Sequence, residues 1–192
     1  DVVARLNLLR QGSLKGLNVT IPYKESVMRY CDRLTETAKE IGAVNTLYMV
    51  DNELVGDNTD YYGFIKLLNL YHVNPKGKVS YILGSGGAAK AVHYALKSLG
   101  AKAVVVSRDK EKIKEQFQLV AGYEVLDIVP KIDIMVNATP IGTSPRGDQM
   151  PVSKAIAQKT VVAIVLIYNP KETMFMKTAS FGIDGAMMLV GQ

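Results

Sequence analysis

The feature that most constrains this fold is an apolar stretch that runs directly into a glycine-rich turn and then into a helical segment. Residues 79–83 fit a strand and residues 88–99 fit a helix. The segment that joins them reads Gly84, Ser85, Gly86, Gly87, Ala88 and Ala89, and its two alanines open the helix. A second apolar stretch, residues 103–106, ends roughly 20 residues beyond the turn, so the pattern predicts a strand–helix–strand unit that binds a dinucleotide.

The small residues of this turn each have a physical role in that interpretation. Gly84 permits a tight turn, Gly86 lets the backbone approach a pyrophosphate, and Ala89 lets the helix pack closely on the strand. The N-terminus of the helix adds amide donors and the positive end of its dipole. A glycine-rich turn that binds nothing is the alternative, and the strand before it and the helix after it argue against that alternative.

The end of the second strand bears on the choice between NADP and NAD. Enzymes that use NAD place an acidic residue there for the ribose hydroxyls, whereas enzymes that use NADP place an arginine for the 2′-phosphate. This chain has Ser107, Arg108 and Asp109 there, with Lys110 and Lys112 just beyond. The guanidinium of Arg108 suits a phosphate, so the sequence favours NADP. NAD stays an alternative, because the carboxylate of Asp109 could bind a free ribose hydroxyl.

The remainder of the second half continues to alternate between strands and helices. We expect a helix over residues 110–119 and strands over residues 134–136 and 161–167. Continuous apolar strands separated by helices are typical of a parallel sheet covered by helices on both faces. We therefore predict a Rossmann-type dinucleotide-binding domain over residues 73–183.

The first half has a different pattern, which predicts a separate α/β domain. Its hairpin turns at Asp51 and Asn52, and Thr35 caps its second helix. The expected elements are a strand at residues 17–21, helices at 23–30, 35–41 and 61–71, and a hairpin formed by 43–50 and 53–56.

A polar segment separates the two halves. Residues 72–78 contain proline and glycine and interrupt the helical period, so they are the best candidate for a linker. We assign residues 1–72 to an N-terminal α/β substrate domain. Residues 184–192 are expected to start a C-terminal helix that packs back toward that domain.

Composition narrows the classes of partner. The formal net charge is +5, but the charges are scattered and lack interleaved aromatic residues, which argues against nucleic-acid binding. The longest apolar run, residues 161–167, is too short to cross a bilayer, so no membrane partner is expected. A small-molecule substrate is the expected partner. The oligomeric state is left open, with a homodimer among the alternatives.

The cysteine and histidine content indicates where in the cell the protein is expected and whether a zinc site is expected. Cys31 is the only cysteine, so an intrachain disulfide is excluded and the reducing cytoplasm is the expected location. His72 and His93 are the only histidines and lie far apart, so no zinc cluster is expected. Both ends of the chain fall within a structural pattern, and we expect the chain to be part of a longer one.

One lysine and one aspartate are the candidates for proton transfer. Lys24 follows a strand and Pro22, which places it at the mouth of a sheet rather than on a charged helix face. Asp60 precedes a helix and offers a carboxylate partner. The structural alternatives are a solvated charge at a helix start for Lys24 and a helix N-cap for Asp60. Thr59 could provide the cap instead, which would free Asp60 for chemistry.

Together with further motifs, these residues resemble those of a known family, the shikimate dehydrogenases. In the first half the resemblance is carried by residues 16–25 (GLNVTIPYKE), 42–46 (GAVNT) and 56–63 (GDNTDYYG). In the second half it is carried by residues 84–88 (GSGGA), 136–142 (VNATPIG), 167–170 (IYNP) and 188–192 (MLVGQ). These runs keep the family's order and extend over nearly the whole chain.

The resemblance implies a role for many individual residues. Lys24 and Asp60 would be the catalytic pair, with Lys24 as the acid and base. The implied substrate-binding residues are Asn18, Thr20, Asn45, Tyr168 and Gln192. The implied cofactor-binding residues are Glu36, Gly84, Ser85, Gly86, Gly87, Ala88, Ser107, Arg108, Lys112, Leu166, Gly185 and Met188, with Asp109 as a further candidate.

The activity implied by the resemblance is the reversible reduction of 3-dehydroshikimate to shikimate with NADPH, a step of aromatic amino-acid biosynthesis. A quinate/shikimate dehydrogenase that uses NAD is the nearest alternative, and a regulator that binds dinucleotide or shikimate without catalysis is another. The chain departs from the family in three places. It lacks the serine pair that binds the substrate carboxylate, it has Ser107, Arg108 and Asp109 in place of Asn-Arg-Thr, and its passage at residues 181–185 is short.

Overall fold

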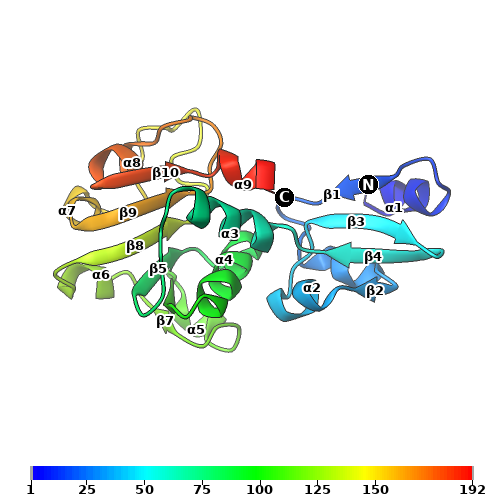
Figure 1. The fold of residues 1–192 in the computed structure, drawn as a ribbon, viewed down its shortest axis with the longest axis horizontal. Helices are drawn as coiled ribbons and strands as arrows, with labels where there is room; N and C mark the ends of the chain where they lie inside the picture. Colours follow the sequence, from blue (N-terminus) through cyan, green and yellow to red (C-terminus); the bar gives the residue numbers. More distant parts are fainter. Residues whose placement is uncertain (1, 192) are drawn as a thin grey trace.

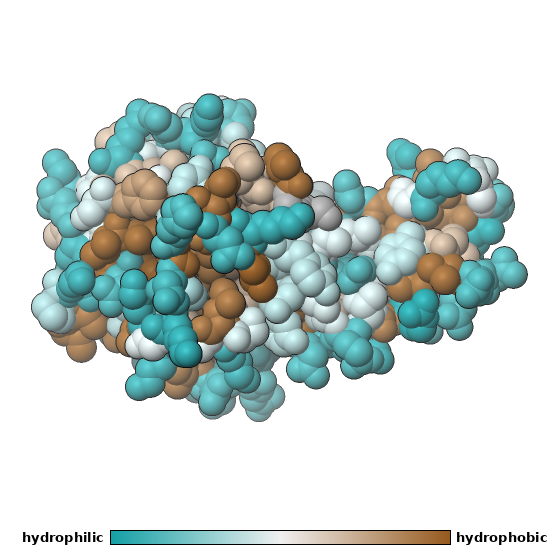
Figure 2. Space-filling model, in the orientation of Figure 1, coloured by the Kyte–Doolittle hydropathy of each residue, from teal (hydrophilic) through white to brown (hydrophobic). Residues whose placement is uncertain are grey.

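The computed structural model describes residues 2–191 and divides them between two lobes, each built around its own sheet (Figure 1). The lobes meet at a narrower waist, which is hollowed on one side (Figure 2). The architecture is α/β, as the sequence predicts. None of the helices within residues 2–191 is long and apolar enough to cross a membrane.

The first lobe is a small mixed sheet in the order β1-β3-β4-β2. Strands β1 and β4 are antiparallel to β3, and β2 is parallel to β4. Leu6, Leu9, Leu47 and Leu54 are among the buried residues of its core. The elements are α1 (Val2–Arg10), β1 (Gly16–Asn18), a 3-10 helix (Ser26–Tyr30), β2 (Arg33–Leu34), α2 (Glu36–Ile41), β3 (Thr46–Val50) and β4 (Glu53–Asp57).

Two local predictions for this lobe are confirmed. Asp51 and Asn52 join β3 to β4 with φ values of 49° and 66°, as a tight hairpin turn requires. The hydroxyl of Thr35 accepts a hydrogen bond from the Ala38 amide and caps α2, which ends at Gly42 with φ 70°.

The predicted helix over residues 23–30 is wrong in its first half. A 3-10 helix forms only over Ser26–Tyr30. The carbonyl of Lys24 accepts a hydrogen bond from the Val44 amide (2.7 Å), and the Met28 amide donates to Glu25 instead. Because Lys24 gives its carbonyl to a neighbouring segment, the first turn of an α-helix does not form there.

The second lobe contains a parallel sheet in the order β10-β9-β8-β5-β6-β7. Counted from β5, this is the 3-2-1-4-5-6 order of a dinucleotide-binding sheet, with the order reversing between β5 and β8. Ligands of such sheets bind at the carboxyl ends of the strands beside that reversal. The strands are β5 (Val79–Leu83), β6 (Lys102–Val106), β7 (Val120–Ala121), β8 (Ile132–Asn137), β9 (Thr160–Val165) and β10 (Phe181–Asp184).

Helices cover both faces of this sheet (Figure 1). Ile82 points to one apolar core and its neighbours Tyr81 and Leu83 point to the other, as alternation along a doubly covered strand requires. The helices are α3 (Asp60–Leu70), α4 (Gly87–Ser98), α5 (Lys110–Ile113), α6 (Val125–Ile128), α7 (Lys154–Gln158), α8 (Met174–Thr178) and α9 (Ala186–Gly191).

The predicted helix over residues 110–119 is also wrong, because α5 ends at Ile113. Two turns of helix would carry the chain away from the sheet. Instead, the Leu119 carbonyl accepts a hydrogen bond from the Val105 amide, and β7 pairs with β6 immediately afterwards. Phe117 is buried in the core on the way.

Helix α3 connects the two lobes. It follows β4 of the first lobe, but its side chains Phe64, Leu67 and Leu68 are buried in the core of the second. It also packs against α9 and α4. In the sequence, α3 falls within the predicted first domain, and the division into residues 1–72 and 73–183 stays a prediction.

Candidate active site

Lys24 and Asp60 form an ion pair at the waist between the lobes. The Lys24 Nζ lies 2.5 Å from Asp60 Oδ2. The side chains of Lys24 and Asp60 are 13% and 4% exposed, so the pair is largely shielded from water. A charged pair with such limited exposure is unusual for a purely structural surface contact.

Local backbone contacts position both partners. The Lys24 carbonyl is held by Val44, and Asp60 is the first residue of α3. The side chain of Asn58 accepts a hydrogen bond from the Asp60 amide (3.1 Å) and donates one to the Ala43 carbonyl (2.8 Å). The interpretation that Thr59 caps this helix is wrong, since Asn58 receives the amide and Thr59 makes no side-chain cap.

Asn45 organises the second oxygen of the carboxylate. Its Nδ2 donates to Asp60 Oδ1 (3.0 Å) and to Thr59 Oγ1 (3.0 Å). Its Oδ1 accepts from the Thr59 amide (2.8 Å) and from the Thr46 hydroxyl (2.9 Å). Asn45 is buried, so this network fixes the direction of the carboxylate toward Lys24.

Tyr168 approaches the same carboxylate from the second lobe. It lies just beyond the carboxyl end of β9. Tyr168 is 46% exposed, and the partial burial of its side chain raises the pKa of its hydroxyl, which the negative charge of Asp60 raises further. The hydroxyl is therefore a neutral hydrogen-bonding group near the ion pair.

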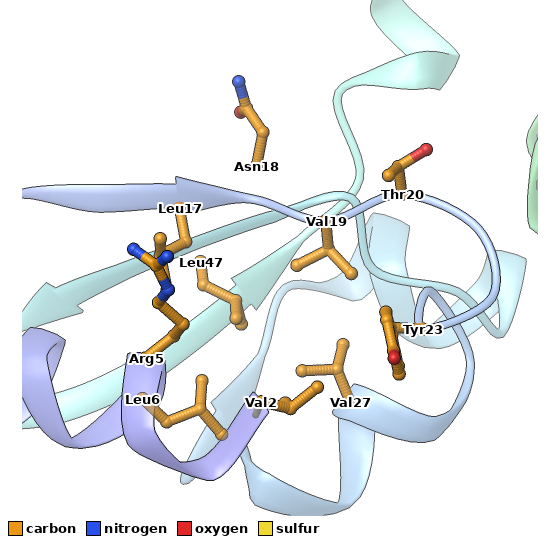
Figure 3. A pocket seen from close by; sticks show the side chains of 10 residues that line it. All are labelled: Val2, Arg5, Leu6, Leu17, Asn18, Val19, Thr20, Tyr23, Val27 and Leu47. Atoms are coloured by element: carbon orange, nitrogen blue, oxygen red, sulfur yellow. The ribbon is translucent and has the colours of Figure 1, made fainter.

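Asn18 and Thr20 lie on the first lobe, close to β1. Figure 3 shows their side chains pointing to one side of the chain, while Val19 between them points to the other. Val19 faces a cavity of about 320 Å³ lined mostly by apolar side chains such as Leu6 and Leu47. Asn18 and Thr20 are at the rim of this cavity and are exposed, so both amide and hydroxyl are available to a polar ligand.

The glycine turn has the geometry expected of a pyrophosphate site. Gly84 has φ +100°, which favours glycine, and a Cβ there would lie 3.1 Å from a Thr139 side-chain carbon. A Cβ at Gly86 would meet no atom within 4 Å, so the backbone at this residue is open to a ligand. Helix α4 begins at Gly87 and directs its first amides toward this opening. These residues fit a dinucleotide.

A pocket of about 370 Å³ lies beside the ends of β6 and β7 and is lined by Ser107, Arg108 and Lys110, among others. Asp109 is the N-cap of α5 and accepts a hydrogen bond from the Lys112 amide (3.3 Å). Its carboxylate thus has a structural role, which weakens the argument for a ribose contact. Lys112 is exposed and does not line the pocket.

The remaining predicted residues fall into three groups. Leu166 and Gly185 are adjacent, since a Cβ on Gly185 would lie 3.0 Å from Leu166 Cα, and Met188 is buried beside them in the core. Glu36 is exposed in the first turn of α2, pairs with Lys39, and makes no polar contact with the glycine turn among the described residues. Gln192 lies outside the described residues.

Three polar residues of this region have contacts that the sequence did not predict, and Thr59 was expected only as a helix cap. Thr59 links Asn45 to the start of α3. Asn137, at the carboxyl end of β8, accepts hydrogen bonds from the amide and the hydroxyl of Thr139, which in turn contacts Gly84. For Asn137 and Thr139 the available signal was their position, since polar residues at the end of a strand beside the order reversal are expected to line the site.

Comparison with known proteins agrees with this arrangement. The family model described as the shikimate dehydrogenase substrate binding domain matches residues 1–47. A Clostridium perfringens protein named shikimate dehydrogenase (NADP(+)) is 43% identical over 188 residues, which cover 93% of this chain and 69% of that protein.

Solved structures give the same result. The chorismate mutase/shikimate 5-dehydrogenase fusion protein from Clostridium acetobutylicum is 40% identical, with a TM-score of 0.90 over 98% of this chain and 71% of that one. A shikimate dehydrogenase in complex with NADP+ is 33% identical, with a TM-score of 0.84 over 96% of this chain and 70% of that one. From its sequence and its fold, the chain belongs to the shikimate dehydrogenase family.

Proposed function

We propose that this protein catalyses the reversible reduction of 3-dehydroshikimate to shikimate with NADPH. Its relatives at about 40% identity are named for the NADP-dependent reaction. The observation that carries the proposal is the position of Lys24, whose ammonium meets Asp60 and whose stem packs against Gly87 of the glycine turn. The proposed proton donor, Lys24, thus lies beside the glycine-rich turn that is expected to bind the dinucleotide.

In this proposal Lys24 moves the proton. When bound, NADPH supplies the hydride to the carbonyl carbon. The Lys24 ammonium donates a proton to the carbonyl oxygen during reduction, and the amine takes the proton from the hydroxyl in the reverse direction. Asp60 stabilises the ammonium and holds it in one direction, while Asn45 holds Asp60. Positioning before reaction is expected to supply much of the rate.

The substrate is proposed to bind at the waist. Asn18 and Thr20 present an amide and a hydroxyl from the first lobe, and Tyr168 presents its hydroxyl from the second. A tyrosine hydroxyl, with an ordinary pKa of about 10, is protonated at neutral pH, so Tyr168 can donate a hydrogen bond to a substrate oxygen. A small polyhydroxy acid suits such a set of groups.

NADP is the proposed cofactor, and its 2′-phosphate is assigned to the pocket beside Arg108. Arg108 and Lys110 provide fixed positive charge there, and the Ser107 hydroxyl provides a further donor. The carboxylate of Asp109 is the feature that favours the alternative cofactor, NAD. This carboxylate already accepts a hydrogen bond from the Lys112 amide. We also propose a cytoplasmic location, since Cys31 is a free thiol.

Initial rates with paired substrates and cofactors test the proposal. Shikimate and quinate are each oxidised with NADP+ and with NAD+, and the absorbance of the reduced nicotinamide is followed. We expect the highest kcat/KM with shikimate and NADP+. A preference for quinate with NAD+ would replace the proposed activity by quinate oxidation. Binding of NADPH and shikimate without turnover of any pair would favour a regulator instead.

A further inference from the structure

Gly87 differs physically from the other glycines of the turn. Gly84 needs its positive φ, and Gly86 faces open space that a ligand can enter. Gly87 is the first residue of α4. A Cβ at this position would lie 2.9 Å from Lys24 Cβ and 3.1 Å from Lys24 Cδ. The absence of a side chain at Gly87 therefore makes room for Lys24.

The overlap involves the part of Lys24 that cannot move easily. The Cβ atom is fixed by the backbone, unlike the far end of a flexible lysine. The backbone of Lys24 is itself held, because its carbonyl accepts a hydrogen bond from Val44. On the other side, Ala43 Cβ would lie 3.4 Å from the added carbon. A methyl group at Gly87 would thus push the Lys24 segment and α4 apart.

A second contact joins the same turn of α4 to the neighbour of Lys24. Lys90 Nζ lies 2.8 Å from Glu25 Oε2, and the Lys90 side chain is 13% exposed. Residues three apart share one face of a helix, so Gly87 and Lys90 face the first lobe together. Ala91, one residue further, is buried against Ile41 and Ala43 of that lobe.

From these contacts we propose that the first turn of α4 positions Lys24. Gly87 gives the lysine stem its place, and Lys90, acting through Glu25, fixes the backbone beside it. The turn that binds the pyrophosphate and the lysine that moves the proton then form one rigid unit. This inference rests on the proposed function for the role of Lys24, and it assigns to Gly87 a task other than contact with the cofactor.

Two alanine substitutions at adjacent glycines separate this role from cofactor binding. For Gly87→Ala we expect kcat to fall by roughly 10- to 100-fold, since displacement by about 1 Å can cost 10²-fold, with the dissociation constant of NADPH changed by less than about threefold. For Gly86→Ala we expect the opposite pattern, with NADPH binding weakened by roughly tenfold or more. NADPH binding is measured by its fluorescence. An unchanged kcat in Gly87→Ala, or a loss confined to NADPH binding, overturns the inference.

A readout that needs no turnover keeps failure of this inference distinct from failure of the proposed function. The ammonium of Lys24 is observed by NMR with isotope-labelled lysine and assigned through its absence in Lys24→Met. We expect Gly87→Ala to shift that signal while Gly86→Ala leaves it in place. An unshifted signal in Gly87→Ala contradicts the inference, whether or not the wild-type protein turns over shikimate.

The ion pair provides an independent check. We expect Lys90→Met and Glu25→Gln each to lower kcat by roughly threefold to tenfold, and the double variant to lower it no further, because partners in one contact are not additive. A larger isotope effect with deuterated NADPH should accompany the loss, as the chemical step becomes slower. Independent, multiplying losses would show that the two residues do not act through each other and would remove Lys90 from the proposal.

Discussion

Replacing Lys24 by methionine tests the proposed proton transfer while leaving most of the site intact. Methionine has an unbranched stem, which keeps the packing against Gly87, but it lacks the ammonium that lies 2.5 Å from the Asp60 carboxylate. A positioned acid or base contributes roughly 10²–10⁴-fold to a rate. We expect kcat to fall by about that factor, which corresponds to about 2.7–5.4 kcal/mol of transition-state stabilisation at about 1.36 kcal/mol per tenfold.

Affinity for shikimate should change much less than kcat. Asn18, Thr20 and Tyr168 remain in place, so the dissociation constant, measured by calorimetry, is expected to stay within about tenfold of the wild-type value. Lys66→Met is the matched control, because Lys66 is an exposed lysine of α3, the helix that begins at Asp60. A Lys24→Met protein with kcat near that of this control refutes the acid–base role. A loss confined to KM would reassign Lys24 to substrate binding.

Four further substitutions test other parts of the structure. Asn45→Ala removes two hydrogen-bond donors and leaves buried partners, so the free energy of unfolding in urea should fall by about 1–3 kcal/mol together with kcat. Arg108→Ala should raise KM for NADP+ by roughly tenfold or more while KM for NAD+ stays constant; equal changes would remove Arg108 from the phosphate site. Gly56→Ala places a Cβ within 3.0 Å of three side chains and should destabilise the first lobe by about 1–3 kcal/mol in the same assay. Burial and a nearby lysine lower the pKa of His93, so the unfolded chain binds a proton first as pH falls below about 6.5, and stability is lost there. Between neutral and mildly acidic pH, the melting temperature of His93→Gln should fall less than that of the wild-type protein. An equal fall in the two proteins would contradict this.

Much of the second lobe could be predicted because its signals are local. The strand over Val79–Leu83, the glycine turn and α4 follow one another in the sequence, and each has a distinct composition. The short strand β10 (Phe181–Asp184) has no such signal. It contains Gly182, where a Cβ would lie 2.7 Å from Met176 Cβ, and it forms by pairing in parallel with β9. Pairing with a distant segment leaves little trace in four residues.

The candidate site also has features that the sequence predicts and features that it does not. Lys24 and Asp60 could be singled out by their positions after a strand and before a helix. Their contact could not be predicted, because the two residues are 36 positions apart in the sequence. The capping role of Asn58 was missed because three polar residues precede α3, and all three can hydrogen-bond a free amide. Asn58 takes this role because its side chain is buried, where it also donates a hydrogen bond to the Ala43 carbonyl of the first lobe.

The placement of α3 has a consequence for protein engineering. A chimera of two related enzymes that joins its parents within residues 72–78 inherits Lys24 and Asp60 from the same parent, but it sets the apolar side of α3 against a foreign sheet. A junction just before Asn58 preserves that packing, yet it takes the ammonium from one parent and the carboxylate from the other. Neither junction exchanges a self-sufficient module. Recombination of such enzymes therefore calls for α3 to be redesigned along both of its boundaries.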